Sequence, residues 1–192
     1  VDLTRFTASP LPNGAVRFLF VGRLLREKGV GEFLEAANGL LAESPEPDVL
    51  RFDLVGEWEN ERSYILRAEL ERLTQASQIS YHGTVPPDRI DTLMRDATCV
   101  VLPSYYGEGV PRVLLEACAS GRPIITTDNV GCRDVVEPGR NGWMVPTKDI
   151  GALKNAMHEC ATADSDMLAA LAEGARRTAE ARFDERIVIN AY

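Results

Sequence analysis

The sequence predicts an α/β domain built on an open parallel sheet of about six strands. Short apolar runs rich in β-branched residues alternate along the chain with segments of helical periodicity, which is typical of right-handed strand–helix–strand units. Glycines or polar clusters follow several of these runs, at Gly22, Gly56, Gly83, residues 104–109 and Asp128. Because ligands of open parallel sheets bind outside the carboxyl ends of the strands, these clusters predict a ligand site at one edge of the sheet.

Hydrophobic spacing gives the expected order of the elements. Apolar runs predict strands at 16–21, 50–55, 79–82, 99–102, 124–127 and 143–145. Helical periodicity and helix-start signals predict helices at about 30–42, 61–77, 89–96, 110–120, 132–136, 149–161 and 164–181. Accordingly, we expect residues 1–15 to be a linker, residues 16–163 to form the sheet-based domain and residues 164–192 to add a C-terminal helix.

The stretch 99–127 carries two glutamates around a predicted helix start. Pro103 ends the preceding strand, and Pro111 suits a first helical turn because its fixed φ and missing N–H do no harm there. Glu108 precedes this helix, and Glu116 lies eight residues on, roughly 12 Å away if the segment is helical. Such a pair can bind two hydroxyl-bearing parts of one extended ligand, although two solvated glutamates are the plainer interpretation.

A glycine turn follows the first predicted strand. Gly22 permits close approach of a ligand to the backbone, and Arg23 and Lys28 add positive charge before the next helix begins. The turn lacks both the G-x-G-x-x-G dinucleotide fingerprint and the G-x-x-x-x-G-K-[ST] spacing of the P-loop. A phosphate cradle is therefore one interpretation, and two surface charges are the other.

Composition excludes several classes of protein. The chain has 192 residues, 45% apolar content and a net charge of -8, which suits a core-forming domain and argues against nonspecific nucleic-acid binding. It has no apolar run of 18 residues and no signal peptide. We expect no cofactor and no metal, because no His, Cys or Asp cluster has ligand spacing. Because the chain begins at Val1 and not at Met, we expect an excised or processed segment whose partner domain is missing.

Several weaker signals favour structural interpretations. Cysteines at 99, 118, 132 and 160 form no C-x-x-C pair and are interpreted as reduced thiols of a cytoplasmic protein. Asp164-Ser165-Asp166 matches a metal–nucleotide motif, but it precedes an amphipathic helix and is interpreted as a helix cap. Ser104 and Ser120 have no partnered histidine, so a hydrolase triad has no support.

Four ordered motifs resemble one known family. GRLLREKG, EGVPRVLLEACASGRPIITTD, GCRDVV and PGRNGWMVP are similar to the C-terminal, donor-binding domain of family 4 glycosyltransferases, over roughly residues 1–163. The resemblance implies a Rossmann-like, doubly wound parallel sheet that forms the C-terminal half of a GT-B fold. It is closest to bacterial transferases that build lipid-linked oligosaccharides and capsular polysaccharides. Residues 164–192 would then return toward a missing N-terminal domain.

The resemblance also implies a nucleotide-sugar site. The implied catalytic residues are Arg23 and Lys28, which would hold the donor diphosphate, and Glu108, which would face the transferred sugar. Glu116 would bind the ribose hydroxyls. The remaining implied binding positions are Gly22, the backbone of Gly109, Val110 and Pro111 for sugar hydroxyls and phosphate, and the segment His82, Gly83 and Thr84 for the base. His82 could equally be a structural residue.

The implied activity is retaining transfer of a sugar from a nucleotide diphosphate sugar, UDP-linked in preference to GDP-linked, to a glycan or lipid-linked acceptor. Implied partners are the N-terminal acceptor domain of the same protein and, through a lipid-linked acceptor, the inner face of the plasma membrane. A sugar-nucleotide epimerase and a noncatalytic nucleotide-sugar binding module remain alternatives. We expect the 192-residue chain alone to bind nucleotide weakly and to transfer nothing, because cleft closure normally completes such a site.

Overall fold

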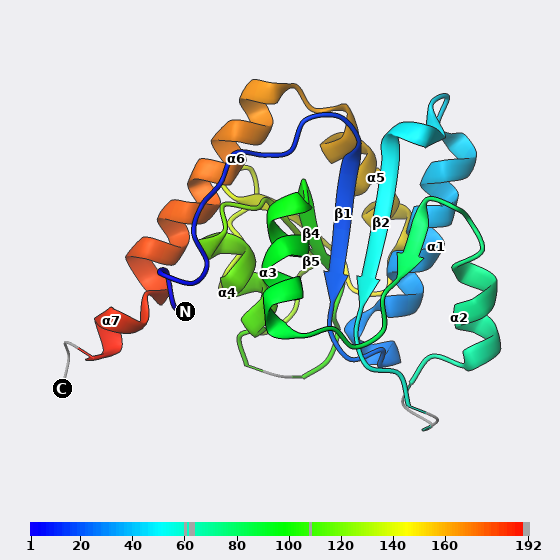
Figure 1. Cartoon of the computed structure of the whole chain (residues 1–192), viewed down its shortest axis with the longest axis horizontal. Coiled ribbons are helices and arrows are strands. Elements are labelled where there is room, and N and C mark those ends of the chain that lie inside the picture. Colours follow the sequence, from blue (N-terminus) through cyan, green and yellow to red (C-terminus); the bar gives the residue numbers. More distant parts are fainter. Residues whose placement is uncertain (60, 62–63, 108, 190–192) are drawn as a thin grey trace.

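Six parallel strands form the sheet of the structure, a computed structural model that describes residues 1–59, 61, 64–107 and 109–189 (Figure 1). The strands are β1 (Val16–Val21), β2 (Leu50–Val55), β3 (Ile79–Tyr81), β4 (Cys99–Leu102), β5 (Ile124–Thr127) and β6 (Gly142–Val145). Their order is β3-β2-β1-β4-β5-β6. The predicted parallel α/β class is therefore confirmed.

The strand order reverses next to β1. Along the chain, β1 is followed by β2 on one side, whereas β4 pairs with the other side of β1 through Phe18↔Cys99 and Leu19↔Val100 and is followed outward by β5. The arrowheads of β1 and β2 in Figure 1 point to the lower edge of the sheet, where the loops that follow the strands gather. A doubly wound sheet of this kind has its topological switch point between the two strands where the order reverses, here β1 and β4.

Helices cover both faces of the sheet. They are α1 (Val30–Glu43), α2 (Arg67–Leu73), α3 (Pro87–Asp96), α4 (Arg112–Ala119), α5 (Ile150–Thr162), α6 (Ser165–Thr178) and α7 (Glu185–Ile189), with short turns η1 (Arg26–Lys28), η2 (Pro47–Val49) and the π-helical η3 (Ala179–Phe183). Helix α1 packs against α5 and α2, whereas α4 packs against α6. Phe33 of α1 contacts Phe20 and Phe52 of the sheet, which anchors α1 by aromatic burial.

Two expected helices are wrong. The segment 61–77 was expected to be helical throughout, but α2 covers only Arg67–Leu73. Tyr64 instead pairs with Leu25 in an isolated bridge, and the Ile65 N–H donates to the Leu24 carbonyl at 3.0 Å. Residues 132–136 form turns and not a helix. In both places apolar residues serve tertiary contacts that single-sequence periodicity cannot distinguish from a helix.

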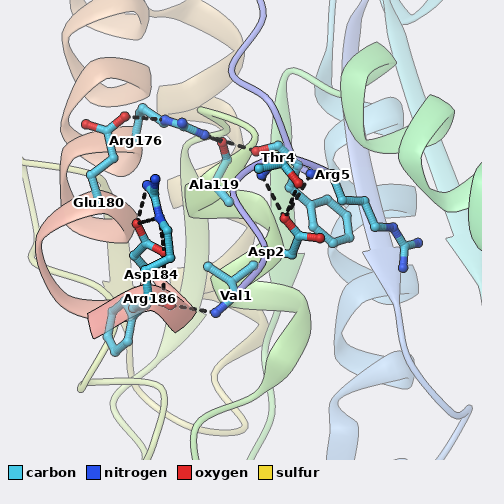
Figure 2. Close-up of polar contacts among 11 residues, drawn as sticks. Val1, Asp2, Thr4, Arg5, Ala119, Arg176, Glu180, Asp184 and Arg186 are labelled. Atoms are coloured by element: carbon cyan, nitrogen blue, oxygen red, sulfur yellow. Dashed lines mark hydrogen bonds and ion pairs between the residues drawn. The ribbon is translucent and has the colours of Figure 1, made fainter. Parts of the chain in front are cut away.

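The first residues of the chain lie beside α6 and the segment that follows it (Figure 2). The amino group of Val1 donates to the Phe183 carbonyl at 2.5 Å, and Arg176 of α6 donates to the carbonyls of Ala119 and Phe6 at 2.6 and 3.0 Å. The first six residues are thereby held against α4 and α6. None of the helices in the described part of the chain combines the length and apolar character that crossing a lipid bilayer requires.

A buried arginine joins the linker to two helix ends. The Arg122 side chain is 0% exposed. It donates to the carbonyls of Ala97 and Ser120, just past α3 and α4, each at 3.1 Å, and to the Ser9 hydroxyl at 2.7 Å. Burial lowers the pKa of Arg122 to about 10, so the guanidinium stays charged at neutral pH. Carbonyl dipoles at the two helix ends stabilise this charge, and the negative charge of Asp96 also favours it.

Replacing Arg122 tests this junction. Arg122→Met leaves buried carbonyls without donors, so we expect the free energy of unfolding to fall by about 2–4 kcal/mol. The matched control is Arg177→Met on α6, whose ion pair with Glu173 is exposed and is worth less than about 1 kcal/mol. Urea unfolding followed by circular dichroism measures both. Equal losses in the two variants would contradict the assignment.

Candidate functional site

A cationic cavity lies at the switch point of the sheet. It has a volume of about 290 Å³ and opens where β1 and β4 end. Its lining residues are Val21, Gly22, Arg23, Lys28, Leu102, Pro111, Arg112 and Val113. The sequence predicted that Gly22, Arg23, Lys28 and Pro111 belong to one site, and the fold brings these four residues to one cavity.

Two glycines let the surrounding loops approach closely. A Cβ on Gly56 would lie 1.7 Å from the carbonyl oxygen of Gly22, so the chain after β2 can contact the chain after β1 only without a side chain there. Gly29 has φ +79°, and a Cβ on it would lie 2.2 Å from the Pro103 carbonyl oxygen. The turn η1, which carries Lys28, is thus pressed against the start of the loop after β4.

The N-terminus of α4 faces this cavity. Pro111 is its N-cap residue, and Arg112 and Val113 are both its first helical residues and part of the cavity lining. Among the described residues no side chain caps this end, and the first turn has no acidic residue. Backbone N–H groups and the positive end of the helix dipole therefore remain available to an anion.

Three cations surround the cavity, and the described residues that line it include no acid. They are Arg23, Lys28 and Arg112. The ammonium nitrogen of Lys28 lies 5.0 Å from the centre of the Tyr106 ring, a cation–π distance. In a chain with a net charge of -8, this local excess of positive charge favours an anionic ligand at this cavity over other parts of the surface.

Sequence reasoning missed Arg112. The signal that could have revealed it is its position directly after Pro111, at the first residue of a helix. A basic side chain there is opposed by the helix dipole, which favours acidic residues at that end. Arg112 adds its charge to this cavity, and it also lies close enough to Glu116 to offset part of the rise that burial causes in the pKa of that carboxyl.

Glu116 does not line the same cavity as Lys28. It lines an adjoining hollow of about 270 Å³ between α4 and the chain ends, and Arg112 belongs to both linings. The other residues of this hollow are Val1, Asp2, Arg5, Phe6, Leu115 and Glu185. Burial raises the pKa of the Glu116 carboxyl, and the charges of Arg112 and Arg5 partly offset this effect.

The loop between β4 and α4 is described only in part. Glu108, the predicted sugar-facing carboxylate, lies outside the described residues. Gly109 and Val110 lead into the N-cap of α4 but are absent from the linings of both hollows. Space around Gly109 is open, with nothing within 4 Å of a Cβ placed there.

The predicted base-binding segment follows β3, the edge strand of the sheet. His82 follows β3, and its Nε2 is 2.7 Å from Oδ1 of Asp53, a buried β2 residue that also pairs with Arg17 at 2.7 Å. Gly83 accepts a hydrogen bond from the Gly56 N–H. His82, Gly83 and Thr84 line neither hollow, so their role in base binding stays a prediction.

Another hollow, of about 250 Å³, lies between α1 and α2 and has the opposite charge. Glu32, Glu35 and Glu69 line it together with Arg26. Burial raises the pKa of Glu32. Three carboxylates repel a phosphate group, which favours the cationic cavity as the anion site.

Two structural interpretations are confirmed. Asp164 caps α6, because its carboxylate accepts a hydrogen bond from the Met167 N–H at 2.7 Å. All four cysteines are buried, and none of them forms a disulfide. Burial raises the pKa of Cys118 to about 12 and also raises that of Cys99, so both thiols stay protonated at neutral pH.

Comparison with known proteins agrees with this architecture. The chain is 29% identical over 197 residues to "Putative colanic acid biosynthesis glycosyltransferase WcaL" of Escherichia coli, covering 98% of this chain and 47% of WcaL. It therefore spans about half the length of this curated relative.

Two solved structures likewise match the whole of this chain with about half of their own length. Sucrose-phosphate synthase from Thermosynechococcus elongatus superposes with a TM-score of 0.83 and 27% identity, over 100% of this chain and 49% of that one. HepE of Anabaena, described in complex with UDP-glucose, superposes with a TM-score of 0.82 over 100% of this chain and 54% of that one; at 24% identity this likeness concerns the fold alone.

A family model gives the assignment directly. The model described as "Glycosyl transferases group 1" matches residues 4–178, which include the whole sheet and the cationic cavity. The chain belongs to the group 1 glycosyl transferases.

Proposed function

We propose that this chain is the donor-binding half of a retaining glycosyltransferase. The full protein would transfer a sugar from a nucleotide diphosphate sugar, UDP-linked in preference to GDP-linked, to a glycan or lipid-linked acceptor. The observation that carries the proposal is the cavity at the switch point, where Arg23, Lys28 and Arg112 meet the N-terminus of α4. A diphosphate matches this combination of charge and N–H donors.

Size and relatives support a nucleotide-sugar ligand. A cavity of about 290 Å³ is at the lower end for small-molecule sites and suits the diphosphate portion of such a ligand. The hollow with Glu116 adjoins it through Arg112, which would place a ribose-binding carboxylate next to the phosphates. HepE, which has the same fold, is described with UDP-glucose bound, and this favours UDP as the first nucleotide to test.

The chemistry follows from where charge develops. Transfer breaks the bond between the anomeric carbon and the diphosphate oxygen, so negative charge grows on the leaving group and positive charge on the sugar. Arg23, Lys28 and the first turn of α4 would stabilise the leaving group most strongly at the transition state. Glu108 would orient the sugar and stabilise its positive charge, and we assign it no covalent attack.

The rest of the site would come from the other half of the protein. Because the chain spans 47% of WcaL, an acceptor-binding half would close over the cavity, exclude water and complete the site. The cavity is open, so the sugar of the ligand would extend beyond the cavity toward the acceptor-binding half.

Calorimetric titration of the full-length protein with UDP, GDP and ADP tests the proposal. We expect UDP to bind most tightly, and we expect the 192-residue chain alone to bind it more weakly and to transfer no sugar. Absence of binding by all three diphosphates would contradict the proposed function. Measurable sugar transfer by the 192 residues alone would contradict the need for a second half.

Lys28→Ala tests the leaving-group role. Removing one preorganised donor costs about 3 kcal/mol at the transition state, so we expect turnover to fall roughly a hundredfold in the full-length protein. Lys154→Ala is the matched control, because Lys154 lies on α5 and pairs with Glu43 away from the cavity. UDP release from a panel of UDP-sugars, with membrane lipids as acceptor, measures both. Unchanged turnover in Lys28→Ala would remove Lys28 from this role.

Glu116→Gln separates binding from stability. Burial raises the pKa of Glu116 in the folded state above its value in the unfolded chain. The protonated carboxyl therefore favours folding, and this favourable contribution is lost as the pH rises from the ordinary carboxyl pKa through the raised one. We therefore expect Glu116→Gln to melt at a higher temperature than the parent at pH 7, and the difference to vanish below about pH 4, where both side chains are neutral.

The same Glu116→Gln variant should bind UDP more weakly, because its amide is a poorer acceptor for ribose hydroxyls than a carboxylate. The exposed control, Glu173→Gln on α6, should change neither melting temperature nor UDP affinity appreciably. A Glu116→Gln variant that binds UDP as tightly as the parent would exclude Glu116 from the site.

A further inference from the structure

Ser104 lies at the centre of a polar network beneath the cationic cavity. It follows Pro103 at the end of β4, and it is 0% exposed. Its hydroxyl donates to the Glu27 carbonyl at 3.3 Å and accepts from the Tyr106 N–H at 3.2 Å. One small side chain thus joins the turn that carries Lys28 to the loop that leads into α4.

The contact between these two loops has independent support. The Glu27 carbonyl also accepts a hydrogen bond from the Tyr105 N–H at 2.9 Å. Two residues further on, Gly29 packs so closely on Pro103 that a Cβ would overlap its carbonyl. Lys28 lies between these two fixed points, so the position of its backbone depends on the loop after β4.

A third loop completes the network. The Ser104 carbonyl accepts hydrogen bonds from the Thr127 hydroxyl and from the Asn129 amide, the latter at 3.3 Å. The same Asn129 amide donates to the Tyr106 carbonyl at 2.9 Å. Backbone and side chain of Ser104 therefore connect the loops after β1, β4 and β5.

A buried hydroxyl with a purely structural role needs fewer hydrogen-bond partners than Ser104 has. Buried hydroxyls usually find one partner to avoid an unsatisfied polar group, as Thr126 does by donating to the Leu102 carbonyl at 2.7 Å. Thr126 is equally buried and lies on β5, but its bond joins β5 to β4 and reaches neither η1 nor the N-terminus of α4. Ser104 differs because its partner Glu27 immediately precedes a cation of the cavity.

We propose that Ser104 is a positioning residue for the diphosphate: its hydroxyl fixes η1 against the loop after β4, so that Lys28 and the first turn of α4 are held ready for the same ligand. This inference rests on the proposed function. A preordered Lys28 binds phosphate without first losing side-chain and turn freedom, whereas a released η1 must be ordered on binding. Ser104 itself touches no ligand in this account.

The test compares UDP with UMP in the full-length protein by calorimetry. UMP lacks the terminal phosphate, so the ratio of the two affinities reports on the diphosphate cradle. We expect Ser104→Ala to lower UDP affinity about fivefold while UMP affinity changes less than twofold. The matched control, Thr126→Val, removes an equally buried hydroxyl; its melting temperature should fall comparably and its UDP/UMP ratio should equal that of the parent.

The outcomes separate this inference from the proposed function. An unchanged UDP/UMP ratio in Ser104→Ala, with the parent still preferring UDP, overturns the role of Ser104 and leaves the donor site intact. A parent protein that shows no preference for UDP over UMP overturns both. If Ser104→Ala does not fold, Asn129→Ala is measured instead, because it removes the donor to Ser104 and Tyr106 from a half-buried position. It should lower the ratio in the same direction, and an unchanged ratio there also overturns the inference.

Discussion

The reversal of strand order between β1 and β4 determines where this molecule can bind a ligand. The chain leaves β1 toward α1 on one face of the sheet, and it leaves β4 toward α4 on the other. Because the two connections diverge, they leave a crevice at the carboxyl ends of these two strands. The cationic cavity occupies this position, so the topology provides the space and the loops provide its chemistry.

Charge and backbone act together at this edge. An acidic chain places Arg23, Lys28 and Arg112 around one helix N-terminus, while Glu32, Glu35 and Glu69 line a different hollow. Cations held by neighbouring loops stabilise an anion well only if those loops keep their relative positions. The close contact of Gly29 with Pro103 and the hydrogen bonds of Ser104 meet this requirement within one half of the protein.

The sequence alone predicted most strands of the sheet correctly because these strands are buried. Runs at β1, β2, β4 and β5 were predicted at their observed bounds, since strands covered on both faces contain continuous apolar residues. The error at residues 61 and 64–66 came from Tyr64 and Ile65, which contact Leu25 and Leu24, about 40 residues earlier. Such contacts leave no periodic signal in a single sequence.

The sequence predicted some residues of the candidate site and missed others. Strand ends and glycines indicated that the loop after Gly22 and the loop before α4 lie at one edge. The family resemblance implied that Arg23, Lys28 and Pro111 belong to one site, and these three residues line one cavity. The separation of Glu116 from Lys28 was not predictable, because it depends on how the first six residues pack against α4 and enclose a second hollow. Arg112 was missed because a single arginine after a proline looks like an ordinary surface charge until the helix start is located.

A crystal structure of the full-length protein with UDP bound tests the central claim most directly. We expect the diphosphate to lie between β1 and β4, within hydrogen-bonding distance of the Lys28 ammonium and of backbone N–H groups in the first turn of α4. A diphosphate bound elsewhere, for example in the hollow between α1 and α2, would contradict it.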